Sequence, residues 1–193
     1  MGRPALFDRQ CLLKSVLETF WQKGFEKTSF ADLEKSSGVK KMTLFREFGN
    51  KENLFLSALE QYHDETRQYF EQALELNSPL LSIEVILDRP ISIATGKRCV
   101  YGCFHANSIV ECNSDNPEVK RIVRDQQKKV RDLLIGILKK GQESGEIRSD
   151  MNAGQLADYI ICSIYGIVVG GKNQVSSGSI RCMKTLIIDA IGK

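Results

Sequence analysis

Proline is scarce in this sequence, at four residues in 193, and none of the four interrupts an apolar stripe. Because proline breaks helices, its scarcity favours long uninterrupted ones. The sequence also lacks any stretch that approaches the roughly 20 apolar residues needed to span a bilayer. Its first residues, MGRPALFDRQ, contain no apolar segment typical of a signal peptide. We therefore expect a cytoplasmic protein with no membrane partner.

A large excess of charge is also missing, because the formal net charge is +3. That value alone does not indicate nucleic-acid binding, but the charge is unevenly distributed. Residues 35–51 hold five basic residues and one acidic residue, a local charge of +4. Such a concentration is typical of a small DNA-binding surface, and a solvated basic loop would explain it equally well. The basic residues are Lys35, Lys40, Lys41, Arg46 and Lys51.

Motifs for catalysis are absent from the sequence. It has no Cys-x-x-Cys pair, P-loop, nucleophile elbow or paired-carboxylate site, so we expect neither an enzyme nor a bound cofactor. Its six cysteines are not expected to form structural disulfides in a cytosolic chain. Two alternatives stay open: a thiol redox enzyme that uses these cysteines, and a helical module that binds protein alone.

Three cysteines and a histidine cluster in one segment, at the spacing Cys-x3-Cys-x-His-x6-Cys. This spacing matches no standard zinc site, and the second cysteine and the histidine would diverge on one helix. We therefore expect no metal there. The four residues are Cys99, Cys103, His105 and Cys112.

Apolar residues recur every three or four positions through nearly the whole chain, which predicts an all-α fold. A first helix is expected to end at Gly24, and Ser29 with Asp32 forms a capping-box pattern for a short second helix. A third short helix is expected over about 40–48. Asn50 is a suitable cap for a fourth helix of about 25 residues, which would belong to both halves of the molecule without a flexible linker.

The remaining chain is also predicted to be helical. Pro79 and Pro90 mark a broken region, and a helix should cover about 102–112. Asn116 followed by Pro117 is a strong helix start, and Gly145 is expected to end that helix. Two further helices are predicted over about 153–169 and 179–191.

The segment from Ser29 to Phe48 has the pattern of a helix-turn-helix, in which one helix braces the DNA backbone and the next enters the major groove. Its turn needs a residue that tolerates positive φ, and Gly38 supplies one. Val39 and Leu44 are expected to anchor the turn and the second helix. The outer face then consists of Lys40, Lys41, Met42, Thr43 and Arg46.

The residues TSFADLEKSSGVKKMTLFREFGNKENLFLSAL closely resemble the TetR family of transcriptional regulators. They follow its pattern of Thr-Thr/Ser, an apolar pair, an Ala/Ser-Gly-Val turn, a Thr-Leu-Tyr/Phe helix, a Phe and Lys-Glu-x-Leu. The resemblance implies a sequence-specific DNA-binding regulator and, by analogy, a one-component repressor. It implies a helix-turn-helix DNA-binding domain over 1–50 and a helical ligand-binding and dimerisation domain over 51–193.

The resemblance also implies roles for individual residues. Thr28 and Ser29 stand where hydroxyls and a helix N-terminus meet phosphate. Lys51 stands where a lysine clamps the DNA backbone from the start of the fourth helix. The positions that contact base edges and nearby phosphates are Lys40, Lys41, Met42 and Thr43.

Three residues depart from the family pattern. Met42 replaces a frequent glycine, and its side chain suits contact with a thymine methyl group. Phe45 replaces a frequent tyrosine and so lacks a hydroxyl for phosphate. Glu47 replaces a frequent histidine and would repel phosphate if it pointed outward. These changes affect which operator is bound rather than DNA binding itself.

A homodimer is expected, because one short recognition helix covers few base pairs. Two such helices roughly 34–36 Å apart suit a palindromic double-stranded operator. The segments 156–169 and 180–191 are apolar over more than one face, and in the TetR family the last two helices form the dimer interface. The residues expected there are Leu156, Ile160, Ile164, Ile167, Val168, Met183, Leu186, Ile187 and Ile191.

The segment YGCFHANSIVEC resembles one TetR subgroup, in which some members respond to electrophiles or oxidants through a cysteine at the position of Cys103. A thiol in the first turn of a helix is activated by the helix dipole, and nearby Lys97 and Arg98 would add to this effect. The alternative is that Cys103 is a small buried hydrophobe. The inducer is thus an unknown small molecule or electrophile, in a pocket lined by Tyr62, Tyr69, His105, Asn107 and Tyr165.

Overall fold

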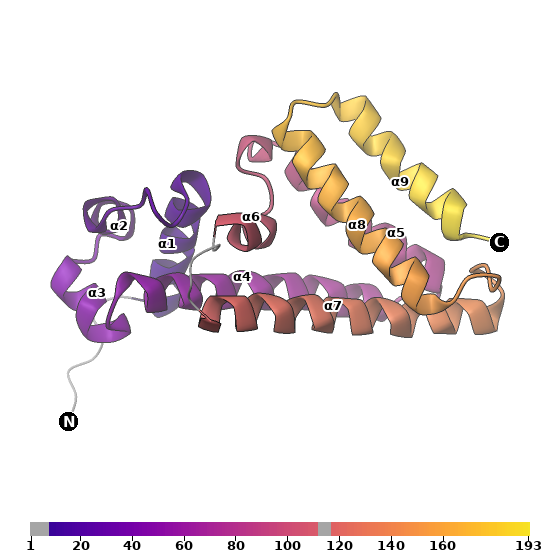
Figure 1. The fold of residues 1–193 in the computed structure, drawn as a ribbon, viewed down its shortest axis with the longest axis horizontal. Helices are drawn as coiled ribbons and strands as arrows, with labels where there is room; N and C mark the ends of the chain where they lie inside the picture. The colour runs from indigo at the N-terminus through magenta and orange to yellow at the C-terminus, as the bar shows by residue number, and fades with distance from the viewer. Residues whose placement is uncertain (1–7, 112–116) are drawn as a thin grey trace.

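The computed structural model describes residues 8–111 and 117–193, and within them the predicted all-α fold is confirmed (Figure 1). The predicted cap Asn116 and the predicted cluster residue Cys112 lie outside the described residues. The helices are α1 Arg9–Lys23, α2 Phe30–Ser37, α3 Lys41–Phe48, α4 Lys51–Leu74, α5 Pro79–Thr95, the short 3-10 helix η1 Cys99–Tyr101, α6 Phe104–Glu111, α7 Pro117–Ser144, α8 Ala153–Lys172 and α9 Ser177–Ile191.

The N-terminal end of the molecule is a head formed by α1, α2, α3 and the first half of α4. Leu33 of α2 and Leu44 of α3 are almost fully buried there, against apolar side chains of α1 and α4. The same hydrophobic cluster continues into Phe104 of α6 and Val119 and Val123 of α7. The head therefore shares its core with elements far along the chain.

The body consists of the remaining helices. Helices α4 and α7 lie side by side along the long axis, and α5, α8 and α9 pack together at the end away from the head (Figure 1). A second hydrophobic cluster fills this body, with Leu87, Leu134 and Ile160 fully buried. Gly171 of α8 permits a close approach to α5, because an added Cβ would lie 2.6 Å from the Ala94 backbone.

The expected break near Pro79 and Pro90 is wrong. Pro79 is the first residue of α5, and the helix continues through Pro90 to Thr95. A proline inside a helix costs about 3 kcal/mol or more, since it removes a hydrogen bond and crowds the preceding turn. The buried side chains of α5, among them Ile86 and Ile91, offset this cost by packing against α8 and α9.

The expectation that no segment is apolar enough to span a bilayer is also wrong. Helix α8 has 20 residues, and its most apolar window has a mean hydropathy of 1.4, which meets that criterion by length and composition. Core helices of water-soluble proteins can meet it as well. Helix α8 packs against α5, α7 and α9, yet only 33% of its most apolar window is buried within one chain. Part of its apolar surface is therefore left for another contact.

Candidate DNA-binding face and pocket

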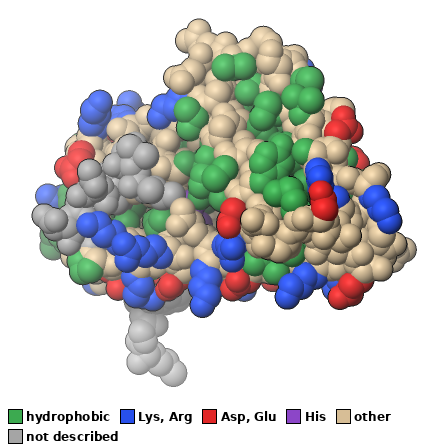
Figure 2. All heavy atoms as spheres, turned by 45° about the vertical axis from the view of Figure 1, so that its right-hand side comes forward, with side chains coloured by type: hydrophobic (Ala, Val, Ile, Leu, Met, Phe, Trp, Pro, Cys, Tyr) green, Lys and Arg blue, Asp and Glu red, His purple; other side chains and the backbone are tan. Residues whose placement is uncertain are grey.

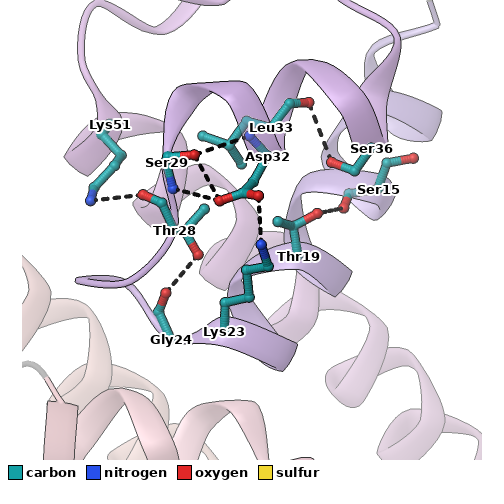
Figure 3. A network of polar contacts seen from close by, with 10 residues as sticks. All are labelled: Ser15, Thr19, Lys23, Gly24, Thr28, Ser29, Asp32, Leu33, Ser36 and Lys51. Atoms are coloured by element: carbon teal, nitrogen blue, oxygen red, sulfur yellow. Dashed lines mark hydrogen bonds and ion pairs between the residues drawn. The ribbon is translucent and has the colours of Figure 1, made fainter.

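Helix α2 begins with a fully formed capping box, as its sequence predicts. The Ser29 hydroxyl accepts a hydrogen bond from the Asp32 backbone N–H, and the Asp32 carboxylate accepts one from the Ser29 backbone. Lys23 of α1 forms an ion pair with the same carboxylate (Figure 3). Hydrogen bonding from Lys23, together with that from Ser29, lowers the pKa of Asp32 well below its usual range. The start of α2 is thus tied to the end of α1.

The turn between α2 and α3 uses the predicted glycine. Gly38 has a φ of 69° and donates its N–H to the carbonyl oxygen of Glu34 at 2.9 Å. Helix α3 has no side-chain cap of its own, because Lys40 at its N-cap makes no such bond. Instead, the Lys41 backbone N–H donates to the Glu34 carboxylate at 2.7 Å. Helix α2 therefore caps α3 through Glu34.

The outer face of α3 is exposed as the sequence predicts. Met42 is 81% exposed, Lys40, Lys41 and Arg46 are exposed, and Thr43 is half-buried. The Lys41 ammonium lies over the stacked rings of Phe30 and Phe45, 5.1 and 5.5 Å from their centroids. Phe45 therefore supports a basic side chain as well as facing outward.

Glu47 forms an ion pair with Arg46, with 3.5 Å between Arg46 Nε and Glu47 Oε1. Both side chains are largely exposed, so the pair is weak. The carboxylate nevertheless lies beside a positive charge. Its repulsion of phosphate is therefore smaller than the sequence alone suggests.

Thr28 does not lie where its predicted contact with phosphate requires. The residue is 1% exposed, and its hydroxyl donates to the Gly24 carbonyl oxygen at 2.6 Å (Figure 3). Its own carbonyl accepts a hydrogen bond from Lys51 Nζ at 3.1 Å, while that ammonium also lies 4.5 Å from the centre of the Phe25 ring. Thr28 therefore braces the head. Ser29 beside it is exposed.

A pocket of about 580 Å³, its mouth included, lies among α4, α6, α7 and α8. It brings together four of the predicted sensing residues, which lie up to 103 positions apart in the sequence: Tyr62, Cys103, His105 and Tyr165. Sequence reasoning missed the other lining residues, which are His63, Thr66, Phe70, Gln126, Gln127, Val130, Ile161 and Ile164. His63 had a signal, since it shares the buried face of α4 with Leu59 and Phe70.

Tyr69 and Asn107 do not line this pocket, contrary to the prediction. The Tyr69 hydroxyl donates to the Val85 carbonyl oxygen at 2.7 Å, which joins α4 to α5. The Asn107 amide donates to the Tyr101 carbonyl oxygen at 2.6 Å, which holds the turn before α6. Both side chains use their polar groups for the fold, and periodicity alone does not distinguish that use from ligand contact.

The two histidines meet in the pocket wall, with 2.9 Å between His63 Nε2 and His105 Nδ1. Burial lowers the pKa of His63 to about 3, with smaller contributions from His105 and Lys129, and burial lowers the pKa of His105 to about 4. Both rings are therefore neutral near pH 7, and one donates its N–H to the other.

Cys103 directly precedes α6 and is half-buried, with 3.4 Å between its Sγ and the Tyr62 hydroxyl oxygen. The expectation that Arg98 adds to the activation of the Cys103 thiol is wrong. Its guanidinium instead pairs with Glu18 of α1 at 3.1 Å and lies over the Trp21 ring. Next to Cys103, the Gly102 carbonyl accepts a hydrogen bond from Trp21 Nε1 at 2.9 Å. The cysteine segment is thus tied directly to the head.

Most residues predicted for the dimer interface are buried inside one chain. The core already covers Leu156, Ile160, Ile167, Val168, Ile187 and Ile191, each at most 2% exposed. Ile164 and Met183 are half-buried, and Leu186 is 54% exposed. The exposed apolar surface of α8 and α9 instead consists mainly of Tyr159, Cys162, Val169, Cys182 and Leu186. In Figure 2, hydrophobic side chains gather over the upper part of the molecule, where these helices lie.

Two family models match the chain. Residues 12–58 match the model of bacterial regulatory proteins of the tetR family, and residues 79–174 match the tetracyclin repressor-like C-terminal domain. The HTH-type transcriptional repressor ComR of Escherichia coli (strain K12) is 32% identical over 179 residues, which cover 91% of this chain and 84% of the repressor. The uncharacterized HTH-type regulator YezE of Bacillus subtilis is 28% identical over 162 residues, with 83% and 84% covered.

Solved structures share the fold. A cysteine mutant of the TetR family regulator CifR, in complex with a 26-bp operator DNA, superposes with a TM-score of 0.82 at 23% identity, over 98% of this chain and all of that one. A TetR regulator from Chloroflexus aurantiacus superposes with a TM-score of 0.83 at 25% identity, over 94% of this chain and 92% of that one. Because these matches span the head and the body, and because ComR is similar along most of its length, this chain belongs to the TetR family of helix-turn-helix transcriptional regulators.

Proposed function

We propose that this chain is a one-component repressor. Two copies form a dimer, their α3 helices bind a palindromic operator, and an effector in the pocket releases the DNA. The exposed basic face of α3 carries the proposal, because α2 and α4 hold this helix while Lys40, Lys41 and Arg46 are exposed toward phosphates and bases. The protein acts in the cytoplasm without catalysis. Residues 1–50 bind DNA, and residues 51–193 bind the effector and the second copy.

The test is binding to duplex DNA from the region upstream of the protein's own gene, measured over a range of salt concentrations. The native protein should bind tightly, with a log–log slope of about −0.9 for each phosphate contact. A Lys40→Ala/Lys41→Ala variant should lose most of this affinity, whereas Lys139→Ala/Lys140→Ala, on the exposed surface of α7, should not. Equal binding by all three proteins, both here and to DNA selected from random sequences, would contradict the proposal.

A second route of release is modification of Cys103, favoured by its position in the pocket wall beside Tyr62. With a maleimide, the sulfur adds to the C=C bond and the thiol proton ends on the neighbouring carbon. The added group would occupy the pocket and displace the segment that Gly102 ties to Trp21. Either route requires only that the ligand favour the conformation that does not bind DNA.

The thiol route is tested with N-ethylmaleimide on the DNA-bound protein. Release should occur for the native protein and for Cys11→Ser, whose cysteine is exposed on α1, but not for Cys103→Ser. Full modification of Cys103, verified by mass spectrometry, without any change in DNA affinity would refute this route and leave effector binding as the mode of release.

A further inference from the structure

We propose that the pocket selects a small, uncharged, planar molecule of the carboxamide or lactam class, one that both donates and accepts hydrogen bonds. The proposal deepens the effector role proposed above and rests on it. It depends on three properties of the pocket wall: the absence of charged side chains, the state of the two histidines, and the polar groups that keep hydrogen-bonding capacity.

The twelve lining residues, all within the described part of the chain, include no lysine, arginine, aspartate or glutamate. A charged ligand would lose its hydration without gaining a counter-ion, which is strongly unfavourable. Two positive charges act on the wall: Arg89 lies 5.6 Å from the centre of the Tyr62 ring, and Lys129 acts on His63. Negative charges of Asp64 and Asp125 line the neighbouring hollow that His63 and Gln126 also border. Ions of either sign are therefore the competing classes that an experiment has to eliminate.

The histidine pair does not supply the missing positive charge. Burial keeps the pKa of both rings at about 4 or below, so an anionic ligand would have to raise one of them by several units to gain a counter-ion. In the neutral pair, the bond between His63 Nε2 and His105 Nδ1 uses one N–H and one lone pair. The two remaining ring nitrogens are then one donor and one acceptor, whichever tautomer is present.

The other polar groups of the pocket wall differ in whether a hydrogen bond within the protein already uses them. Thr66 donates to the Tyr62 backbone carbonyl, and the Tyr62 hydroxyl meets the Cys103 thiol. By contrast, the Tyr165 hydroxyl oxygen accepts a hydrogen bond from Gln127 Nε2 at 3.0 Å. Burial raises the pKa of Tyr165, so the hydroxyl keeps its proton and can donate it in a hydrogen bond to a ligand.

Gln126 is the polar side chain most suited to a ligand. It is 8% exposed and lines the pocket, and among the described residues no hydrogen bond to its amide group is found. A primary amide offers one N–H donor and one carbonyl acceptor side by side, which matches the same pair on a carboxamide or lactam. The aromatic rings of Tyr62, Phe70 and Tyr165 line the same pocket, and they favour a flat ligand.

The test compares three molecules of the same shape and different charge: benzamide, benzoate and benzamidinium. Each is titrated into the full-length protein without DNA, and binding is measured by calorimetry and by the shift in melting temperature. Benzamide should bind about tenfold more tightly than either ion, because each ion loses its hydration without gaining a counter-ion in the pocket. Tighter binding of benzoate or benzamidinium, or no binding of benzamide at millimolar concentrations, would overturn the proposal.

Variants then locate the contact. Gln126→Leu should lose about tenfold in benzamide affinity, since it removes the amide at similar volume. Gln68→Leu, on the exposed side of α4, should retain it. If Gln126→Leu does not fold by circular dichroism, His105→Phe tests the contact of the histidine pair instead, because it removes both ring nitrogens of His105 at similar volume. Unchanged affinity in the folded variant would overturn the assignment.

A DNA-binding assay distinguishes the proposed ligand class from the proposed release of DNA by an effector. If benzamide binds the pocket with the predicted selectivity but leaves operator affinity unchanged, the ligand class holds and the proposed release mechanism fails. If DNA is released while the isosteric ions bind better, the release mechanism holds and the ligand class fails.

Discussion

The head and the pocket differ in how their polar side chains are satisfied. In the head, Ser29, Asp32 and Lys23 bind one another, and Glu34 binds the backbone of α3. In the pocket wall, no hydrogen bond within the described residues is found for the Gln126 amide, for His63 Nδ1 or for His105 Nε2. Groups that satisfy one another hold a fixed geometry, which recognition of DNA requires, whereas groups with spare capacity can bind a third molecule.

Trp21 is one residue at which the two regions meet. Trp21 of the head donates to the Gly102 carbonyl, packs its ring edge-on against Tyr62 at 5.4 Å, and carries Arg98 over its face. Tyr62 lines the pocket, so a displacement there reaches the head through two adjacent rings and one hydrogen bond. We expect this contact to contribute to the coupling between effector and DNA.

The largest expected effect is acid destabilisation of the pocket. The folded pKa values of His63 and His105, about 3 and about 4, lie below the value of 6.5 expected when unfolded. The unfolded chain therefore binds more protons, and stability falls as the pH drops below 6.5 until the folded pKa values are reached. At pH 5 each histidine should cost about 2 kcal/mol of unfolding free energy.

Urea unfolding at pH 7 and pH 5 measures this loss. His105→Phe should remove about half of it, because one titrating ring is gone. His63 and His105 are the only histidines in the sequence, so the loss is assigned to this pair. A stability that stays constant between these pH values would contradict the neutral histidine pair.

A second effect concerns the apolar surface of α8 and α9. Leu186→Asp should raise the dissociation constant of the dimer about 100-fold, since each subunit would bury an unpaired carboxylate. Leu74→Asp, at an exposed leucine outside these helices, is the matched control. Sedimentation velocity measures both variants. A dimer unaffected by Leu186→Asp would mean that a different surface pairs the subunits.

A smaller effect is expected at the cap of α3. Glu34→Ala removes the acceptor for the Lys41 N–H, and a lost cap costs about 0.5–2 kcal/mol. Operator affinity should fall severalfold. Glu34→Gln keeps an acceptor and removes a negative charge near the DNA, so it should bind at least as well as the native protein. Fluorescence anisotropy checks this order, with Glu26→Ala as an exposed control in the same head; equal losses in both Glu34 variants would refute the capping role.

The smallest effect is expected at the junction. Trp21→Phe keeps a ring but loses the bond to Gly102, worth about 0.5–1.5 kcal/mol. Hydrogen exchange should become faster in α6, while the amides of α9 keep their rates. Unchanged exchange in α6 would show that the two regions are not coupled through this bond.

Much of the head was predictable because its signals are local. The capping residue Ser29, the turn glycine Gly38 and the apolar spacing around Leu33 and Leu44 each act within a few positions of the chain. The same applies to Asn50, whose side chain accepts from the Asn53 N–H at the start of α4 as expected. Such features depend on backbone conformation and helical period, which nearby residues set.

The body was less predictable because its decisive contacts join distant residues. Pro90 stays within a helix because α8 and α9 pack on α5, and Ile160 and Ile187 are buried by their own chain rather than by a partner. His63 and His105 meet although 42 positions separate them.

Local patterning was therefore sufficient for the helical fold, the helix-turn-helix and the basic outer face of α3. Only the packing of the helices decided which polar side chains bond within the fold and which face the pocket. It buried Thr28, brought Trp21 into hydrogen-bonding distance of Gly102, and placed Gln126 in the pocket wall. The reason is physical. Helix formation depends on neighbours three or four positions apart, whereas burial, desolvation and hydrogen-bond pairing depend on which surfaces meet in three dimensions.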